Sequence, residues 1–287
     1  MKGNFQLILV IIFIVAAVVG IMVFSGAIPL GNKKDVSPLK GNVTLWGTQT
    51  KTAMASADFK STYAGAAEVF LGNKGTIAFP LTIDPLVMYY NRSILDTNGI
   101  VYPPTYWDEF NEMSGKITKK DDAGQIIKSA VGFGQYSNVN NAKDIVTALF
   151  MQTGNPIVQN EGGALRSSLS GLETSKSLGD ALAFYTSFAD PLKPSYSWNK
   201  GFPNSQDAFS SGSVAFYFGF ASELPTLIKK NPNQNLGIAP LPQIKNSSTK
   251  ATRGRVAGIA VSSFSKNFTT AYATATHHQK TPMTFSD

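Results

Sequence analysis

The chain has 287 residues, a formal net charge of +7 and no cysteine. This length allows one large domain or two of ordinary size. The missing cysteines exclude disulfides, thiolate nucleophiles and thiolate metal sites, and the lysines and arginines are too scattered for a nucleic-acid surface, which needs clustered cations.

The N-terminal segment is almost free of polar side chains. Residues 5–24 carry no charge, and Gln6 is their only strongly polar side chain. About 20 apolar residues in a helix span the hydrocarbon core of a bilayer. We therefore expect residues 1–27 to form a single transmembrane helix that anchors the chain in the cell membrane, with the rest on the extracytoplasmic side. The small residues 25–27 leave a cleaved export signal as the alternative.

The next segment changes composition. Residues 28–41 are rich in proline, glycine and lysine and lack periodicity, so we expect a tether. A short strand is predicted at 43–46, where Gly47 stops it. Residues 86–90 form an apolar run between a proline and an asparagine, which is typical of a buried strand.

A helical region follows this strand. The sequence after Asn91 predicts a short helix that stops at Gly99. Thr105 is then expected to cap a longer helix, with Asp108 at its third position. Trp107 begins a series of apolar residues at helical spacing, so core packing is favoured for it over ligand contact.

The second half of the chain alternates helical patterns with short apolar runs. We expect helices ending near Gly154 and before Pro191, a short helix at 205–211 and a proline-interrupted helix at 221–232. Strands are expected at 213–219, 236–242 and 256–263. This alternation indicates an α/β fold with a largely parallel sheet.

Several motifs in this order resemble one protein family. They are "VTLWGT", "IAFPLTIDPLVMYYNRSIL", "NGIVYPPTYWDEF", "DAFSSGSVAFYFG", "LGIAPLP" and "RGRVAGIAV". Together the motifs resemble extracellular solute-binding proteins of the sugar-binding type, which serve ABC importers. The resemblance implies a two-lobed periplasmic-binding-protein-like fold, with hinge strands that cross between the lobes and a ligand in the cleft.

The resemblance also implies lobe boundaries. The first lobe would comprise residues 42–90 and 256–287, and the second lobe residues 91–255. Because 47–77 is too short for the strand–helix units that normally build a first lobe, we expect this lobe to be incomplete. A truncated relic that binds nothing stays open as an alternative.

The implied partners are a small-molecule ligand, a carbohydrate in this family type, and the permease subunits of an ABC importer in the membrane. Neither cofactor nor metal is expected, and no catalytic residue is assigned. Sugars present apolar faces and hydroxyl rims, so their sites combine aromatic side chains with polar ones. The candidate ligand-binding residues are Trp46, Thr48, Thr82, Asp84, Tyr89, Trp198, Gly219 and Arg255.

These candidates lie where strands end or loops begin, which is where open α/β sheets bind ligands. Trp46 ends the first strand, and core packing is an equal alternative for it. Asp84 is expected to accept hydrogen bonds from hydroxyls, or else to cap a turn. Tyr89 and Tyr90 alternate along a strand, so at most one of them can face a cleft.

The remaining candidates come from the second half of the chain. Trp198 lies in a loop of serine, asparagine and glycine, which predicts an exposed, functional aromatic. Gly219 either lets a ligand approach the backbone or ends a strand. Arg255 is placed at the return crossing, with an ordinary surface position as the alternative.

Enzymatic readings have little support in the sequence. His277 and His278 are adjacent, which is not the spacing of a zinc site, and no other histidine supplies the base of a Ser-His-Asp triad. The alternative that stays open is an anchored carbohydrate-active hydrolase, because 18 acidic residues always allow some carboxylate pair.

Overall fold

The structure is a computed structural model that describes residues 70–72, 75–161, 164–168 and 176–280. The predicted anchor, tether and first strand lie outside these residues. Among the helices that are described, none is both long and apolar enough to cross a membrane.

The chain divides into two compact units. The smaller comprises Met1–Thr48 and Val261–Asp287, and the larger comprises Gln49–Ala260. The described part of the smaller unit contains α9 (Phe268–Lys280). The lobe boundaries derived from the sequence stay predictions.

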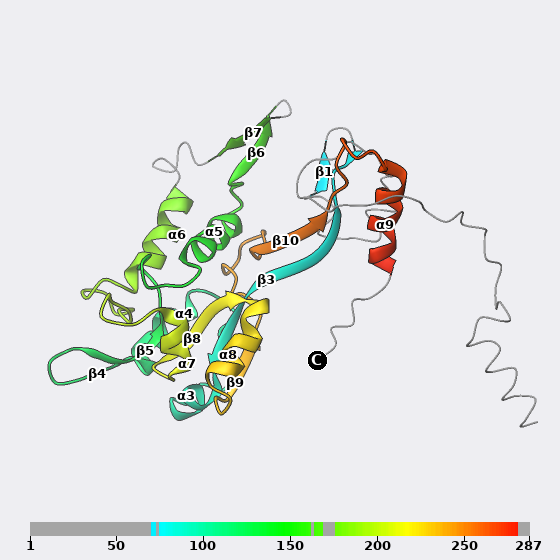
Figure 1. The fold of residues 1–287 in the computed structure, drawn as a ribbon. Helices are drawn as coiled ribbons and strands as arrows, with labels where there is room; N and C mark the ends of the chain where they lie inside the picture. The colour runs from blue at the N-terminus through cyan, green and yellow to red at the C-terminus, as the bar shows by residue number, and fades with distance from the viewer. Residues whose placement is uncertain (1–69, 73–74, 162–163, 169–175, 281–287) are drawn as a thin grey trace, which may run out of the picture. The chain divides into compact units, whose positions relative to one another are not determined.

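The larger unit contains strands and helices in alternation (Figure 1). Its described strands are β1 (Leu71–Gly72), β2 (Gly75–Thr76), β3 (Phe79–Asn91), β4 (Lys119–Lys120), β5 (Ile126–Val131), β6 (Val158–Glu161), β7 (Ala164–Ser167), β8 (Val214–Phe220), β9 (Leu236–Ala239) and β10 (Gly254–Ile259). Its described helices are α3 (Arg92–Thr97), α4 (Glu109–Ile117), α5 (Ala142–Gln152), α6 (Lys176–Ser187), α7 (Ser205–Ser210), the 3-10 helix η2 (Ala221–Glu223) and α8 (Leu224–Lys230).

The main sheet has the order β10-β3-β8-β5-β4, and β9 pairs with β3 as well. Only β5 and β8 run parallel among its described pairs, and the other pairs are antiparallel. The expected α/β architecture is confirmed, but the expectation of a largely parallel sheet is wrong for this part of the chain. Alternating helices and buried strands indicate which elements form, but they leave the direction of each strand open.

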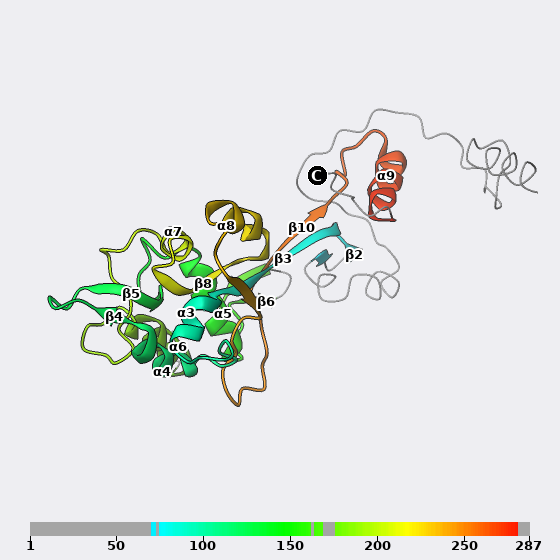
Figure 2. The ribbon, with the colours of Figure 1, turned by 90° about the horizontal axis from the view of Figure 1, so that it is seen from below.

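Strand β3 is longer than the sequence predicts. Residues 86–91 of β3 lie between β8 and β9, whereas residues 79–85 pair with β10. Both views show β3 and β10 running side by side away from the helices that cover the sheet (Figures 1 and 2). The predicted strand 86–90 is therefore the inner part of an element that continues beyond the body of the unit.

The helix that contains Phe110 packs as expected. Trp107 is buried, and its indole Nε1 donates a hydrogen bond to Gln152 Oε1 at 2.7 Å. Core packing of Trp107 is thus confirmed. The predicted cap is wrong, because α4 begins at Glu109, whose carboxylate accepts a hydrogen bond from the backbone N–H of Thr105 at 2.7 Å.

The short helix after β3 forms as predicted. Asn91 Oδ1 accepts a hydrogen bond from the backbone N–H of Ile94 at 3.3 Å and caps α3. Gly99 follows with a φ of +67°, a conformation that favours glycine. This turn directs the chain from the end of β3 into the helical layer.

Candidate functional site

Two loops leave the main sheet at the same edge. The parallel strands β5 and β8 end there, β5 leading to α5 and β8 leading to η2. Leu86 of β3 pairs with Phe220, the last residue of β8, so the inner half of β3 starts at this edge too. The carboxyl ends of parallel strands are the usual ligand-binding edge of an α/β sheet.

Polar side chains from separate elements gather at this edge. We call them the polar rim: Asp84, Asn141, Asp144, Ser222, Arg253 and Arg255.

Asp84 connects β3 to the end of β8. Its Oδ1 accepts a hydrogen bond from the backbone N–H of Ser222 at 2.9 Å, and its Oδ2 accepts one from the Ser222 hydroxyl at 2.7 Å. Arg255 is the partner of Asp84 in the β3–β10 register. Asp84 therefore lies where β3 passes from the body of the unit to its pairing with β10.

Asp144 connects α5 to the start of β10. Its Oδ1 lies 3.2 Å from Arg253 Nε, and its Oδ2 lies 3.9 Å from a terminal nitrogen of Arg255. The Arg255 guanidinium also lies 3.5 Å from the centre of the Phe220 ring. Because the Arg255 side chain is 56% exposed, much of its hydrogen-bonding capacity faces solvent.

Asn141 precedes α5 in a left-handed conformation, with a φ of +58°. Its amide nitrogen donates to the backbone oxygen of Phe218 at 3.3 Å and to Glu223 Oε1 at 3.0 Å. This side chain therefore joins the start of α5 to the end of β8. Together the rim offers carboxylate, amide, hydroxyl and guanidinium groups, which suit a ligand rich in hydroxyls.

Three of the predicted site residues meet at this edge. Asp84 and Arg255 belong to the rim, and Gly219 lies in β8 just behind it. A Cβ atom on Gly219 would lie 2.6 Å from the Tyr217 ring and 3.0 Å from Glu223 Oε2. Those side chains thus fill the space that a side chain at 219 would need, and the strand continues past this glycine. Thr82 lies nearby on β3 and is exposed.

Tyr89 supports the rim from within the core. It is fully buried, and its hydroxyl donates to the backbone oxygens of Phe220 at 2.9 Å and Ala221 at 3.2 Å. Burial raises the pKa of Tyr89 well above its ordinary value, so the hydroxyl stays protonated and keeps donating. Tyr90 is also buried, in a different apolar cluster. The predicted alternation is confirmed, but in the described unit neither tyrosine faces solvent.

The predicted exposure of Trp198 is wrong. Its indole is fully buried, stacks on Phe202 with ring centres 4.4 Å apart and donates from Nε1 to Asn138 Oδ1 at 3.1 Å. A Cβ on Gly132 would lie 3.3 Å from the indole. The loop is polar in sequence, but its buried tryptophan holds it against the sheet. Trp46 and Thr48 lie outside the described residues.

The sequence prediction missed Asn141, Asp144, Ser222 and Arg253. A usable signal was present for two of them, because "NNAKD" precedes an apolar helical pattern and polar residues gather at helix starts. Ser222 and Arg253 have no such signal, since only the paired strands bring them to this edge. In the described ranges, no group of histidine and acidic side chains is suited to hold a metal ion.

A separate cavity of about 570 Å³ lies between α4, α5, α6 and the loop at 244–247. Leu149, Ala181 and Phe184 contribute apolar surface to it, and Asp108 and Asp180 contribute carboxylates. It shares no residue with the polar rim.

Comparison with known proteins identifies the family. The model of the bacterial extracellular solute-binding protein family matches residues 27–274, so the chain belongs to this family. The resemblance inferred from the sequence motifs is thereby confirmed.

Solved structures show the same fold at low identity. A maltotriose-binding protein from Thermus thermophilus, bound with maltotriose, is 21% identical, with a TM-score of 0.51 over 77% of this chain and 54% of that protein. An ABC substrate-binding protein from Listeria monocytogenes in complex with cycloalternan is 17% identical, with a TM-score of 0.54 over 74% of this chain and 50% of that protein. A maltose-bound protein from T. maritima is 18% identical, with a TM-score of 0.53 over 76% of this chain and 54% of that protein. The chain spans about half the length of each.

Proposed function

We propose that this member of the bacterial extracellular solute-binding proteins captures a sugar or oligosaccharide and delivers it to an ABC importer. The observation that carries the proposal is the polar rim at the carboxyl ends of β5 and β8. Its donors and acceptors match the hydroxyl groups of a sugar. The oligosaccharides held by the solved proteins of the same fold support this ligand class.

The proposed mechanism is hinge closure. The rim lies where β3 and β10 continue away from the body of the larger unit. A ligand that contacts both lobes stabilises the closed arrangement, because it binds that arrangement more tightly than the open one. Trp46 and Thr48 are proposed to contribute contacts from the first lobe. The protein binds its ligand without chemical change, and the permease subunits receive it.

We further propose that residues 1–27 tether the protein to the cell membrane with the binding unit outside. The length and apolarity of residues 5–24 support this placement. Protease added to intact spheroplasts should digest the binding unit, and the protein should sediment with membranes. Recovery in the soluble cytoplasmic fraction would contradict the proposal.

The binding test uses thermal melting of the full chain with maltose, maltotriose, mannotriose and cycloalternan. A ligand present at a hundred times its Kd stabilises the native state by about 2.7 kcal/mol, so the melting temperature rises. Chromatography should return the bound sugar intact, whereas release of smaller sugars would favour a hydrolase. A cooperative melt that no sugar shifts would contradict sugar binding, and a chain without a cooperative melt would favour a relic.

Arg255→Ala tests the rim itself. We expect affinity to fall on the order of tenfold, because a guanidinium that bonds a ligand hydroxyl is lost. Lys229→Ala is the matched control, since it removes an exposed cation in the last turn of α8 that does not belong to the rim. Equal affinities of the two variants would show that Arg255 does not contact the ligand.

A further inference from the structure

Glu223 lies half-buried behind the polar rim, at the end of η2. Its Oε1 accepts hydrogen bonds from the backbone N–H of Phe220 at 2.9 Å and from the Asn141 amide at 3.0 Å. Its Oε2 accepts hydrogen bonds from Gln206 Nε2 at 2.8 Å and from the Tyr217 hydroxyl. One carboxylate therefore joins β8, the start of α5 and α7.

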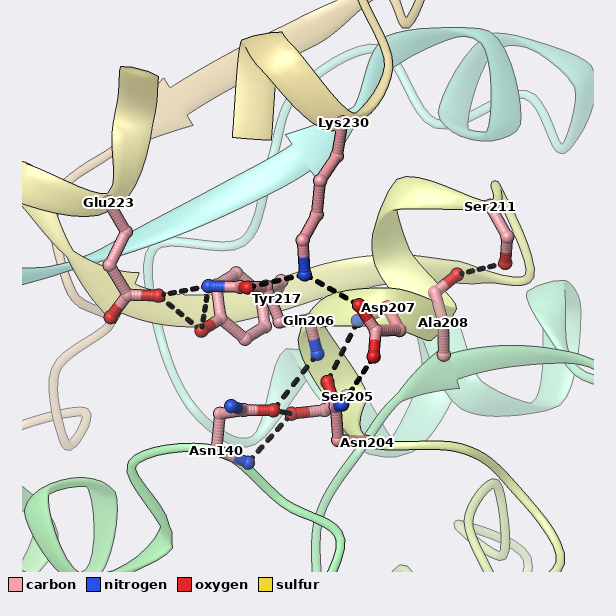
Figure 3. A network of polar contacts seen from close by, with 10 residues as sticks. All are labelled: Asn140, Asn204, Ser205, Gln206, Asp207, Ala208, Ser211, Tyr217, Glu223 and Lys230. Carbon is pink, nitrogen blue, oxygen red and sulfur yellow. Dashed lines mark hydrogen bonds and ion pairs between the residues drawn. The ribbon is translucent and has the colours of Figure 1, made fainter. Parts of the chain in front are cut away.

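The neighbours of Glu223 are themselves held as donors (Figure 3). Gln206 Oε1 accepts a hydrogen bond from Lys230 Nζ at 2.8 Å, which turns the amide nitrogen of Gln206 toward Glu223. Burial, followed by the charge of Glu223, raises the pKa of Tyr217 well above its ordinary value. The Tyr217 hydroxyl thus stays protonated and donates to the carboxylate.

The far side of this network is fixed as well (Figure 3). Lys230 forms an ion pair with Asp207, and Asn204 caps α7 by accepting a hydrogen bond from the Asp207 backbone N–H at 2.9 Å. Asn140 Oδ1 accepts hydrogen bonds from the Ser205 hydroxyl at 3.2 Å and from the Gln206 backbone N–H at 3.1 Å. The loop before α5 is therefore tied to α7 both directly and through Glu223.

The four partners of Glu223 are all donors, so the side chain at 223 must accept hydrogen bonds at both of its terminal atoms. A glutamine at 223 has the same shape but carries one amide nitrogen, which is a donor. Placed at Oε2 it faces the Gln206 nitrogen, and placed at Oε1 it faces the N–H of Phe220 and the Asn141 amide. Either orientation leaves donors without an acceptor, so the carboxylate is required and its shape alone is not enough.

We infer that Glu223 is a positioning residue that fixes the α5 side of the polar rim relative to the β8 side. Through Asn141 it sets the start of α5, which carries Asp144, and through the Phe220 N–H it sets the end of β8, which leads to Ser222. The effect on ligand affinity rests on the proposed function. The positioning of the rim does not.

The positioning is tested by amide hydrogen exchange on the full chain without ligand. Glu223→Gln is expected to speed exchange at the Phe220 N–H and across residues 141–145 on the order of tenfold, while amides in β5 and α6 keep their rates. Glu112→Gln is the matched control, because it makes the same change in an exposed pair with Lys116 on α4. Unchanged exchange at the rim would overturn the inference, and so would a uniform rise across the unit, which indicates a general loss of stability.

A double-mutant cycle tests whether Glu223 acts through Asn141. Asn141→Gly removes the side chain and tolerates the left-handed backbone. In the double variant, rim exchange across residues 141–145 should match that of Asn141→Gly alone, because the shared link is already lost. Full additivity of the two changes would overturn the pathway through Asn141.

Maltotriose and mannotriose serve as probes in the ligand arm of the test. If the wild-type chain binds either sugar, Glu223→Gln should weaken that binding on the order of tenfold, and unchanged affinity would overturn a role in recognition. If the wild-type chain binds neither sugar, that result counts against the proposed sugar ligand. The exchange rates then still decide whether Glu223 positions the rim.

Discussion

The two halves of β3 belong to one continuous strand but lie in different surroundings. Residues 86–91 are almost all buried, between β8 and β9. Residues 79–85 pair with β10 alone over most of their length, and Ile83 is 55% exposed there, whereas Leu86 is fully buried. A strand that passes from a packed sheet to a two-stranded ribbon keeps its backbone hydrogen bonds while losing apolar contacts. Regions with few buried contacts open at low free-energy cost, so the difference places flexibility in residues 81–85, the part of the outer half that is not buried.

The position of the rim follows from this contrast. Asp84 and Arg255 lie at the junction between the halves, and Asp144 lies on α5 in the packed body. Under the proposed function, a ligand held there contacts groups from both kinds of surroundings. Binding can therefore alter how the outer half of β3 moves without disturbing the core.

The largest expected effect comes from shortening one apolar side chain in each half of β3. Leu86→Ala should lower the free energy of unfolding by about 2–5 kcal/mol, because it leaves a cavity in the core. Ile83→Ala, three residues earlier, should cost less than about 1 kcal/mol because its side chain is already half in water. Urea unfolding followed by circular dichroism measures both. Similar losses would show that the outer half is as well packed as the inner half.

Alkaline pH should lower the free energy of unfolding, because the body of the larger unit contains buried tyrosines. Burial raises the pKa values of Tyr185 and Tyr217 above their ordinary value of 10.0. The unfolded chain then loses these protons before the folded chain does, so stability is full below pH 10 and falls as pH rises further. Each tyrosine should contribute a loss of about 1.4 kcal/mol per pH unit.

Unfolding curves between pH 9 and 11 measure this slope. Tyr185→Phe should reduce the slope by about one proton per molecule, since phenylalanine does not ionise. Tyr102→Phe is the control, because Tyr102 is largely exposed. A slope that Tyr185→Phe leaves unchanged would contradict the assignment.

A third experiment disturbs the ribbon. A Cβ on Gly258 would lie 2.7 Å from the Phe79 backbone oxygen, so Gly258→Ala should cost about 1–3 kcal/mol through forced backbone shifts. Gly254→Ala is the matched control in the same strand, since a Cβ there would lie 3.8 Å from the backbone oxygen of Asp84, which is an ordinary contact distance. Hydrogen exchange should rise in β10 and in residues 79–85 only. Equal behaviour of the two variants would rule out tight packing at 258.

The smallest expected effect concerns the junction. Asp84→Ala removes both hydrogen bonds to Ser222 and should lower stability by about 1 kcal/mol, because these groups are partly exposed and water replaces the lost partner. Exchange at the Ser222 N–H reports the loss directly. An unchanged rate would show that the contact contributes little in solution.

Much of the local structure could be predicted from the sequence. Helix α3 ends two residues before Gly99, and helix α5 ends at Gln152, close to the expected Gly154. Strand β8 also lies close to its expected range. These elements depend on neighbouring residues, so the local pattern carries the information. The direction of each strand cannot be predicted from the local pattern, because β3 pairs with a strand more than a hundred residues away.

The candidate site was predictable only in part. Strand ends are common ligand positions, which is why Asp84 and Arg255 were predicted, and the structure brings both to the rim, whereas Glu223 gave no local signal. Its partners come from three elements that meet only after folding. Trp198 shows the opposite failure, since its polar neighbours in sequence suggested solvent while distant residues bury it.

Strand β4 has a consequence for solution behaviour. It closes one side of the main sheet with two exposed lysines, Lys119 and Lys120. An edge strand has unpaired backbone groups to which a neighbouring molecule can add its own strand. A short, positively charged edge strand opposes this by repulsion and by hydration. The protein can therefore be concentrated at low salt with little tendency to polymerise through this edge strand, and Lys119→Val with Lys120→Val should remove that protection.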